Sequence, residues 1–248
     1  MTALLFISAL LAATTAQPTG TRIGSFDEFA NAQKEDSREV RLIGVRFADC
    51  VVKKQPAAAS AFVLEQAAKL EKGDLRRLMG KVADGPCLLD AANSFGAVQM
   101  RFPSDTMRYT LADALFRAQP PAGPLTIPAT LPTIGHPTFE EAEYQAAMTR
   151  GGSKRKLAEL TLSRSKEIAR IFLSSFGECV VRTNPAGSYA LLRSNVLTPE
   201  EDSAFVALRP AFGLCLDEGQ KLTMNKSILR GTVALNHYRL AQAVRQGQ

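Results

Sequence analysis

Apolar residues recur at three- and four-residue steps in two distant parts of the chain, as amphipathic helices require. In the first part the apolar stripe runs through Val40, Ile43, Phe47, Cys50 and Val51. In the second part the stripe is longer and runs through Leu157, Leu160, Ile168, Ile171, Phe172, Phe176 and Cys179, with Lys154, Arg155, Lys166 and Arg170 mostly facing away. Each stripe predicts a helix that places one cysteine on its buried side.

Prolines and capping residues predict where the following helices begin. Each opening helix ends before a proline, Pro56 or Pro185, which suits the first turn of the next helix because its missing N–H would be unpaired there. Thr198-Pro199-Glu200-Glu201 predicts a further helix start through a capping box, and the second cysteines are expected in loops. The second helices are predicted at 56–71 and 185–194. A third helix follows in each half, and the closing helices are predicted at 104–118 and 225–244.

Two short segments have a different pattern. Val98 to Phe102 alternates apolar with polar residues, and Leu222 to Met224 repeats this before the second closing helix, so one short strand is expected in each half. Six prolines between residues 119 and 137 exclude a helix and predict a semi-rigid connector. After it, Thr138-Phe139-Glu140-Glu141 is typical of a capping box that opens a short helix, which Gly151-Gly152 would end. The expected fold class is all-α.

The two halves carry the same sequence blocks in the same order, which predicts a duplicated module. Phe47-Ala48-Asp49-Cys50-Val51-Val52 recurs as Phe176-Gly177-Glu178-Cys179-Val180-Val181, and a closing block from Arg108 to Arg117 recurs from Arg230 to Arg239. We therefore divide the chain into a signal segment (1–16), a first helical repeat (17–118), a proline-rich linker (119–137) and a second helical repeat (138–248).

The four cysteines are expected to form one disulfide within each repeat. Of the three pairings that four cysteines allow, the repeat selects Cys50–Cys87 and Cys179–Cys215, because the second cysteines follow the first by 37 and 36 residues. The alternative, metal ligation or a redox pair, is disfavoured because neither C-x-x-C spacing nor a histidine cluster accompanies them. No metal or cofactor is expected.

Residues 1–16 are typical of a secretory signal, because an apolar run from Ala3 to Ala13 is followed by small residues. A buried N-terminal helix is the alternative. The run is shorter than a membrane span, and no later segment is long and apolar enough to be one. The expected location is the periplasm or the extracellular space, where disulfides persist.

The net charge of +6 favours anionic partners in the cell envelope, such as polymers or lipid head groups. Nucleic acid is not expected, because the chain has no Trp, only 7% aromatic residues and no basic stretch interleaved with aromatic rings.

Catalytic motifs are almost absent from the sequence. Ser163 to Lys166 fits S-x-x-K but lacks the companion elements of the enzymes that use it. Of the two histidines, His136 lies in the connector and His237 occupies the position of Leu115, which favours a packed core residue. The acidic pairs Glu140-Glu141 and Glu200-Glu201 are interpreted as helix caps.

Recurring arginines are the candidate binding residues. Arg108 and Arg117 in the first closing helix match Arg230 and Arg239 in the second. They are expected either to form structural salt bridges and carbonyl caps or to present guanidinium groups to a carboxylate or phosphate of a partner.

The blocks Phe-x-Asp/Glu-Cys-Val-Val and Arg-x-Thr-Leu/Val-Ala resemble a group of uncharacterised exported bacterial proteins that carry such a module once or twice. This resemblance implies export and a repeat, and no activity. We expect a non-catalytic helical protein that binds a protein or an anionic component of the envelope. The alternatives are a hydrolase with a carboxylate-based site that only the fold assembles, and an inhibitor or chaperone with an exposed apolar patch.

Overall fold

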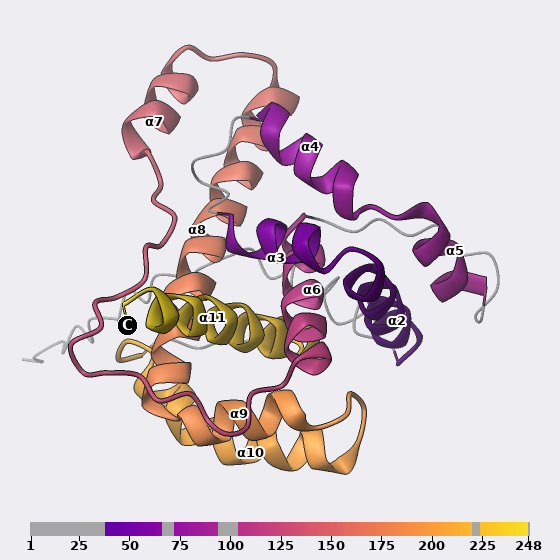
Figure 1. The fold of residues 1–248 in the computed structure, drawn as a ribbon. Coiled ribbons are helices and arrows are strands. Elements are labelled where there is room, and N and C mark those ends of the chain that lie inside the picture. The colour runs from indigo at the N-terminus through magenta and orange to yellow at the C-terminus, as the bar shows by residue number, and fades with distance from the viewer. Residues whose placement is uncertain (1–37, 66–71, 94–103, 220–223, 248) are drawn as a thin grey trace, which may run out of the picture.

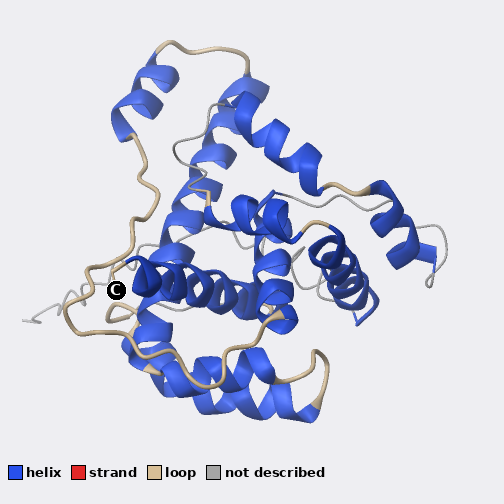
Figure 2. Ribbon diagram, in the orientation of Figure 1, coloured by secondary structure: helices blue, strands red, loops and turns tan. Residues whose placement is uncertain are grey.

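The computed structural model of this 248-residue protein describes residues 38–65, 72–93, 104–219 and 224–247. These residues form helices joined by loops and contain no strand (Figures 1 and 2). The helices are α2 (Arg38–Lys54), α3 (Pro56–Leu64), α4 (Lys72–Val82), α5 (Gly85–Asn93), α6 (Ser104–Ala118), α7 (Glu141–Thr149), α8 (Lys154–Thr183), α9 (Pro185–Arg193), α10 (Pro199–Leu214) and α11 (Lys226–Gln246). The predicted all-α fold is confirmed.

Three predictions fall on other parts of the chain. The signal segment 1–16 and the strand at 98–102 lie outside the described residues. Of the second predicted strand, only Met224 is described, and it lies in an irregular segment before α11.

The first half is built around α6. Helix α2 packs against both α6 and α5, and α3 lies on α6. The apolar stripe of α2 is buried at Ile43, Phe47 and Val51, which are at most 2% exposed, but the prediction was wrong for Val40, which is 38% exposed near the start of the helix. Burying each such side chain stabilises the fold by about 1.5–3 kcal/mol.

The second half is built around α8 and α11. Helix α8 runs through the molecule, with α7 beside its first turns and α9 and α10 near its end (Figure 1). Helix α11 crosses the middle of the molecule and contacts α8, α9 and α6. Thr198 accepts a hydrogen bond from the Glu201 N–H, so the predicted cap of α10 is confirmed.

The two halves meet where α6 and α11 cross. Gly231 permits this contact, because a Cβ atom there would lie 2.3 Å from Cβ of Tyr109. The buried apolar side chains of both halves join in one cluster, which includes Leu111 and Phe116 of α6 and Val233 and Leu240 of α11. The residue boundaries of two separate repeats stay a prediction, since the described residues share one core.

Both predicted disulfides are present. Cys50 is joined to Cys87, and Cys179 to Cys215. On the chain-entropy model each bridge stabilises the fold by about 3–4 kcal/mol. The expectation that both second cysteines lie in loops is wrong for Cys87, which is buried within α5, while Cys215 follows the last residue of α10.

The connector contains no helix, as its prolines predicted, and side chains of the second half fasten it. Arg182 donates hydrogen bonds to the carbonyls of Leu131 and Pro132, and Tyr189 donates one to Pro121. Ile134 donates its N–H to the Glu178 carboxylate. The predicted Thr138 cap is wrong, because α7 follows Glu140, whose side chain makes no capping bond.

Candidate functional site

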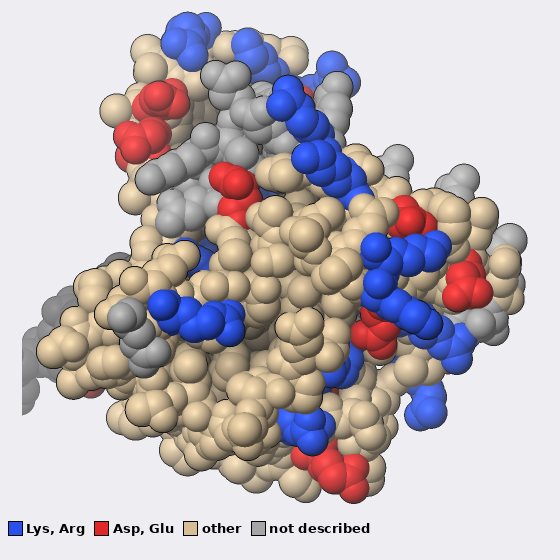
Figure 3. All heavy atoms as spheres, in the orientation of Figure 1, with Lys and Arg blue, Asp and Glu red and all other residues tan. Residues whose placement is uncertain are grey.

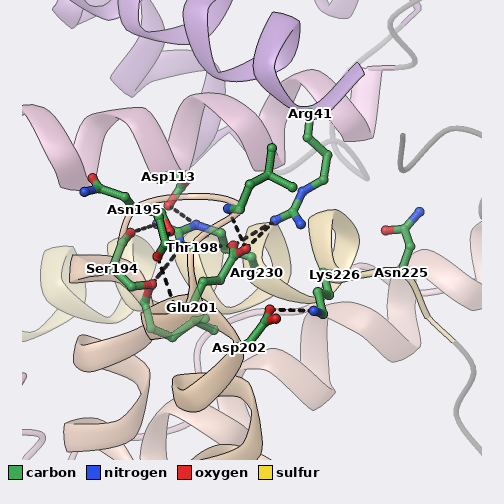
Figure 4. A network of polar contacts seen from close by, with 12 residues as sticks. Arg41, Asp113, Ser194, Asn195, Thr198, Glu201, Asp202, Asn225, Lys226 and Arg230 are labelled. Atoms are coloured by element: carbon green, nitrogen blue, oxygen red, sulfur yellow. Dashed lines mark hydrogen bonds and ion pairs between the residues drawn. The ribbon is translucent and has the colours of Figure 1, made fainter. Parts of the chain in front are cut away.

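The four recurring arginines occupy three different environments. Arg230 is buried, and its N–H groups donate hydrogen bonds to acceptors inside the protein (Figure 4). Its guanidinium donates to Asp113, to Glu201, and to backbone carbonyls at the end of α9, including Leu191. The interpretation of this arginine as a salt bridge and carbonyl cap fits these contacts.

Glu201 is the centre of this buried network. Both of its carboxylate oxygens accept from Arg41, at 2.7 and 2.9 Å, and one accepts from Arg230 at 3.3 Å. The Leu197 N–H completes its contacts, so the carboxylate does more than cap α10. Since Arg41 comes from α2, this network joins the first half to the second.

Arg108 makes the same kind of contact as Arg230. It donates from Nε and Nη2 to the carbonyl of Phe62, at 3.3 Å. Phe62 lies twelve residues after Cys50, and Leu191 lies twelve residues after Cys179. Matching arginines therefore cap matching carbonyls at the ends of α3 and α9, which supports the proposed duplication.

Arg108 and Arg239 also meet at one small recess, which we call the arginine recess. It has a cavity volume of about 30 Å³, and α6, α8, α11 and the connector contribute to its walls. Arg170 of α8 is the third cation there, and it pairs with Glu167. Within the described part of the chain, Arg108 and Arg239 have no carboxylate within 4 Å.

Burial sets the electrostatics of the arginine recess. It lowers the pKa of Arg108 to about 10 and also lowers the pKa of Arg239. Burial raises the pKa of Asp105, the carboxylate beside them, although Arg170 and Arg108 oppose this shift. At a pKa of about 10 Arg108 stays charged at neutral pH, so the recess holds buried positive charge next to Asp105 and Glu65.

Arg117 lies at a second and larger depression, which we call the groove. The groove has a volume of about 930 Å³, within the range of small-molecule sites, and lies between α11 and the helices of the first half. Its apolar walls are formed by Val52, Ala57, Ala114, Leu115, Phe116 and Ala241. On the face shown in Figure 3, charged side chains stand around a broad uncharged surface.

The charge of the groove is mainly positive. Lys53, Arg117 and Arg245 line it, against the single acid Asp49. Arg117 is paired with Asp49 at 2.6 Å and with Asp113. Burial alone would lower the pKa of Arg117, but these two carboxylates raise it. Lys53 and Arg245 have no carboxylate within 4 Å among the described residues, so both are available to a ligand.

His237 lies in the wall of the groove and is 3% exposed. Its ring packs edge-on against Phe116, with centroids 5.1 Å apart, as expected for a packed core residue. Its Nε2 is buried and has no hydrogen-bond partner in the described structure. Burial lowers the pKa of His237 to about 4, so the ring is neutral at pH 7.

Sequence reasoning missed several residues of both depressions. Arg170 was assigned to the solvent side of its helix, while Lys53 and Arg245 were not singled out. Lys53 follows the repeated cysteine block, where Arg182 occupies the matching position, so the repeat held a signal for it. Arg245 lies beyond the repeated blocks and had none.

Among residues 38–65, 72–93, 104–219 and 224–247, no group of three His, Cys, Asp or Glu side chains stands close enough to bind a metal ion. Within these ranges, no helix combines the length and the apolar character that crossing a membrane requires.

Fold and contacts together define an all-α protein with two internal disulfides, a buried arginine–carboxylate network and a cationic groove. Comparison of the chain with protein-family models, with curated proteins and with solved structures gave no match.

Proposed function

We propose that this protein is exported and binds an anionic amphiphile of the cell envelope in the groove. The observation that carries the proposal is the combination of apolar walls with Lys53 and Arg245, two cations without a carboxylate partner among the described residues. Apolar walls take the hydrocarbon part of such a ligand, and the cations take its phosphate or carboxylate. The disulfides fit an oxidising compartment outside the cytosol.

The shape of the groove favours binding over catalysis at this place. The groove is wide, its wall histidine is neutral at pH 7, and its single carboxylate is paired with Arg117. A general base must accept a proton near neutral pH, and His237, whose pKa burial lowers to about 4, is poorly suited to that role.

Vesicle binding tests this proposal. The full protein should co-sediment with vesicles of phosphatidylglycerol and phosphatidylcholine, and not with phosphatidylcholine alone. In the double variant Lys53→Gln/Arg245→Gln, we expect the affinity for anionic vesicles to fall about tenfold or more, because each basic residue near an anionic surface contributes about 1 kcal/mol.

A matched variant separates the groove from general charge attraction. Lys154→Gln/Arg155→Gln removes the same charge from the exposed start of α8, away from the groove, and should change the affinity less than about threefold. Equal losses in both double variants would show that net charge alone drives binding. Binding that does not depend on the anionic lipid would also overturn the proposal.

A further inference from the structure

A serine, a histidine and a glutamate stand in line beside the arginine recess. Nδ1 of His136 lies 2.8 Å from Oγ of Ser174, and Nε2 lies 2.7 Å from Oε2 of Glu178. Ser174 and Glu178 are four residues apart on α8 and so share one face of the helix, while His136 comes from the connector. Ser174 is also a wall residue of the recess.

Arg239 also contacts the hydroxyl of Ser174. Its Nη1 lies 3.2 Å from Oγ of Ser174 and can only donate, so the serine oxygen accepts this bond. The hydroxyl proton of Ser174 is then free to point to Nδ1 of His136. With Nδ1 as acceptor, the neutral ring carries its proton on Nε2, next to the Glu178 carboxylate.

Two hydrogen bonds fix the position of the Glu178 carboxylate. Its other oxygen, Oε1, accepts from Arg182 at 2.7 Å and from the Ile134 N–H at 3.0 Å. The carboxylate is 2% exposed. Its Oε2 lies 2.7 Å from Nε2 of His136 but makes no hydrogen bond to it, so this contact becomes an ion pair only when the ring is protonated.

His136 is suited to accept a proton at neutral pH. Burial lowers its pKa, while Glu178 opposes this shift, so burial favours the neutral ring in the folded protein. The other charged group that faces it is the Arg239 guanidinium, which lowers the pKa further. A neutral imidazole between a serine hydroxyl and a carboxylate is the arrangement that activates serine nucleophiles.

We propose that Ser174, His136 and Glu178 form a hydrolytic site for small acyl esters of anionic molecules. The recess of about 30 Å³ has room for roughly two water-sized groups, which fits the oxygen and methyl of an acetyl group. Arg108, Arg170 and Arg239 would hold a carboxylate or phosphate of the substrate and stabilise the oxyanion. This activity goes beyond the binding proposed for the groove and uses different residues.

The reaction would proceed through an acyl-serine intermediate. Oγ of Ser174 attacks the carbonyl carbon while its proton moves to Nδ1 of His136, and the protonated ring lies against Glu178. The bond from carbon to the alcohol oxygen then breaks, and the alcohol leaves with the proton from His136. Water attacks the acyl-serine, gives one proton to His136, and releases the carboxylic acid as Ser174 regains its hydrogen.

Covalent labelling tests the nucleophile directly. A fluorophosphonate probe reacts with an activated serine by forming an O–P bond and losing fluoride, and peptide mass mapping should place the label on Ser174. Ser174→Ala and His136→Gln should both abolish labelling. Ser175→Ala removes the exposed neighbouring hydroxyl, which bonds only to carbonyls of its own helix, and should label like the parent.

The kinetics of ester hydrolysis test which class of substrate the site accepts. With 4-acetoxybenzoate as the anionic ester, Ser174→Ala and His136→Gln should lower kcat/KM by about 100-fold or more. Arg108→Gln should raise KM for this ester by a larger factor than it raises KM for the neutral methyl 4-acetoxybenzoate. The parent rate should fall with decreasing pH as His136 takes up a proton.

If the contacts of His136 with Ser174 and Glu178 only hold the connector in place, the experiments will give a different result. In that case Ser174 would not be labelled in the parent protein, and its esterase rate would equal that of Ser174→Ala. Either outcome, in protein whose disulfides and near-UV circular dichroism are intact, overturns the proposal.

Discussion

The arginine side chains in this protein differ in the acceptors that their N–H groups contact. Arg230 is surrounded by acceptors of its own chain, two carboxylates and the last carbonyls of α9, so nothing remains for a ligand. Arg108 and Arg239 bond to a carbonyl or a hydroxyl and face the recess without a carboxylate within 4 Å among the described residues. Repeated positions therefore lie in a closed ionic network in one place and at the wall of a recess in another.

His237 makes stability depend on pH. Its pKa is about 4 in the folded protein and about 6.5 when unfolded, so the unfolded chain binds the proton more tightly. The free energy of unfolding should therefore decrease as pH falls from about 6.5 to 4, by roughly 3 kcal/mol from this residue. Denaturant unfolding at pH 7 and at pH 4 measures the change.

The leucine variant isolates this contribution. His237→Leu introduces the residue type found at the matching position, Leu115. In this variant, the decrease in the free energy of unfolding between pH 7 and pH 4 should be smaller than in the parent by most of the roughly 3 kcal/mol attributed to His237. An equal loss in parent and variant would show that His237 does not titrate between these states.

At the scale of elements, α6 and α11 approach each other closely where they cross. A Cβ at Gly231 would meet the Cβ of Tyr109 at 2.3 Å and its Cα at 3.2 Å, so the two backbones would have to separate. Such crowding differs from contact with the flexible end of a side chain, which can turn away.

Gly231→Ala should therefore lower the free energy of unfolding by about 1–3 kcal/mol, despite the better helix propensity of alanine. Gly213→Ala is the control, since a Cβ there meets no atom within 4 Å and should be neutral or slightly stabilising. Urea unfolding of both variants gives the comparison. A stable Gly231→Ala protein would contradict the close approach of these helices.

At the scale of the whole molecule, the two halves share a core and a buried ionic network. Arg41 of α2 reaches Glu201 of α10, which is 0% exposed, and Asp113 of α6 reaches Arg230 of α11. A buried charge that loses its partner is strongly destabilising, whatever the net contribution of the intact pair. We therefore expect both halves to unfold together.

Glu201→Gln removes the central charge with little change of shape. It should lower the free energy of unfolding by about 3–5 kcal/mol, because Arg41 and Arg230 would remain buried without their shared carboxylate. Glu159→Gln breaks the exposed pair with Arg155 and should change stability by less than about 1 kcal/mol. Calorimetry should show one transition in each variant, and a second one would contradict a shared core.

Much of the helical structure could be predicted from the sequence. The closing helix at 104–118 was predicted with its observed bounds, and α9 and α10 begin at the prolines that predicted them. Prediction failed where a local signal was ambiguous. Thr138 has the pattern of a cap but makes none, and Gly85 begins a helix that encloses Cys87 in what was expected to be a loop.

The candidate sites were less predictable, because they depend on residues that are distant in the chain. Arg108 and Arg239 were identified from the repeat, but no spacing indicated that they would meet in one recess with Arg170. His136 was recognised only as a residue of the connector, and its position between Ser174 and Glu178 has no local signal.

By itself, the sequence determined the all-α class, the starts of α9 and α10 and the pairing of the cysteines, because these depend on apolar spacing, capping groups and a repeated block. Only the tertiary structure decided which polar groups meet. Arg41 and Glu201 are 160 residues apart, and Ser174 and His136 are 38 apart. Such contacts arise when helices and the connector pack around a common core, and no short pattern in the chain encodes that arrangement.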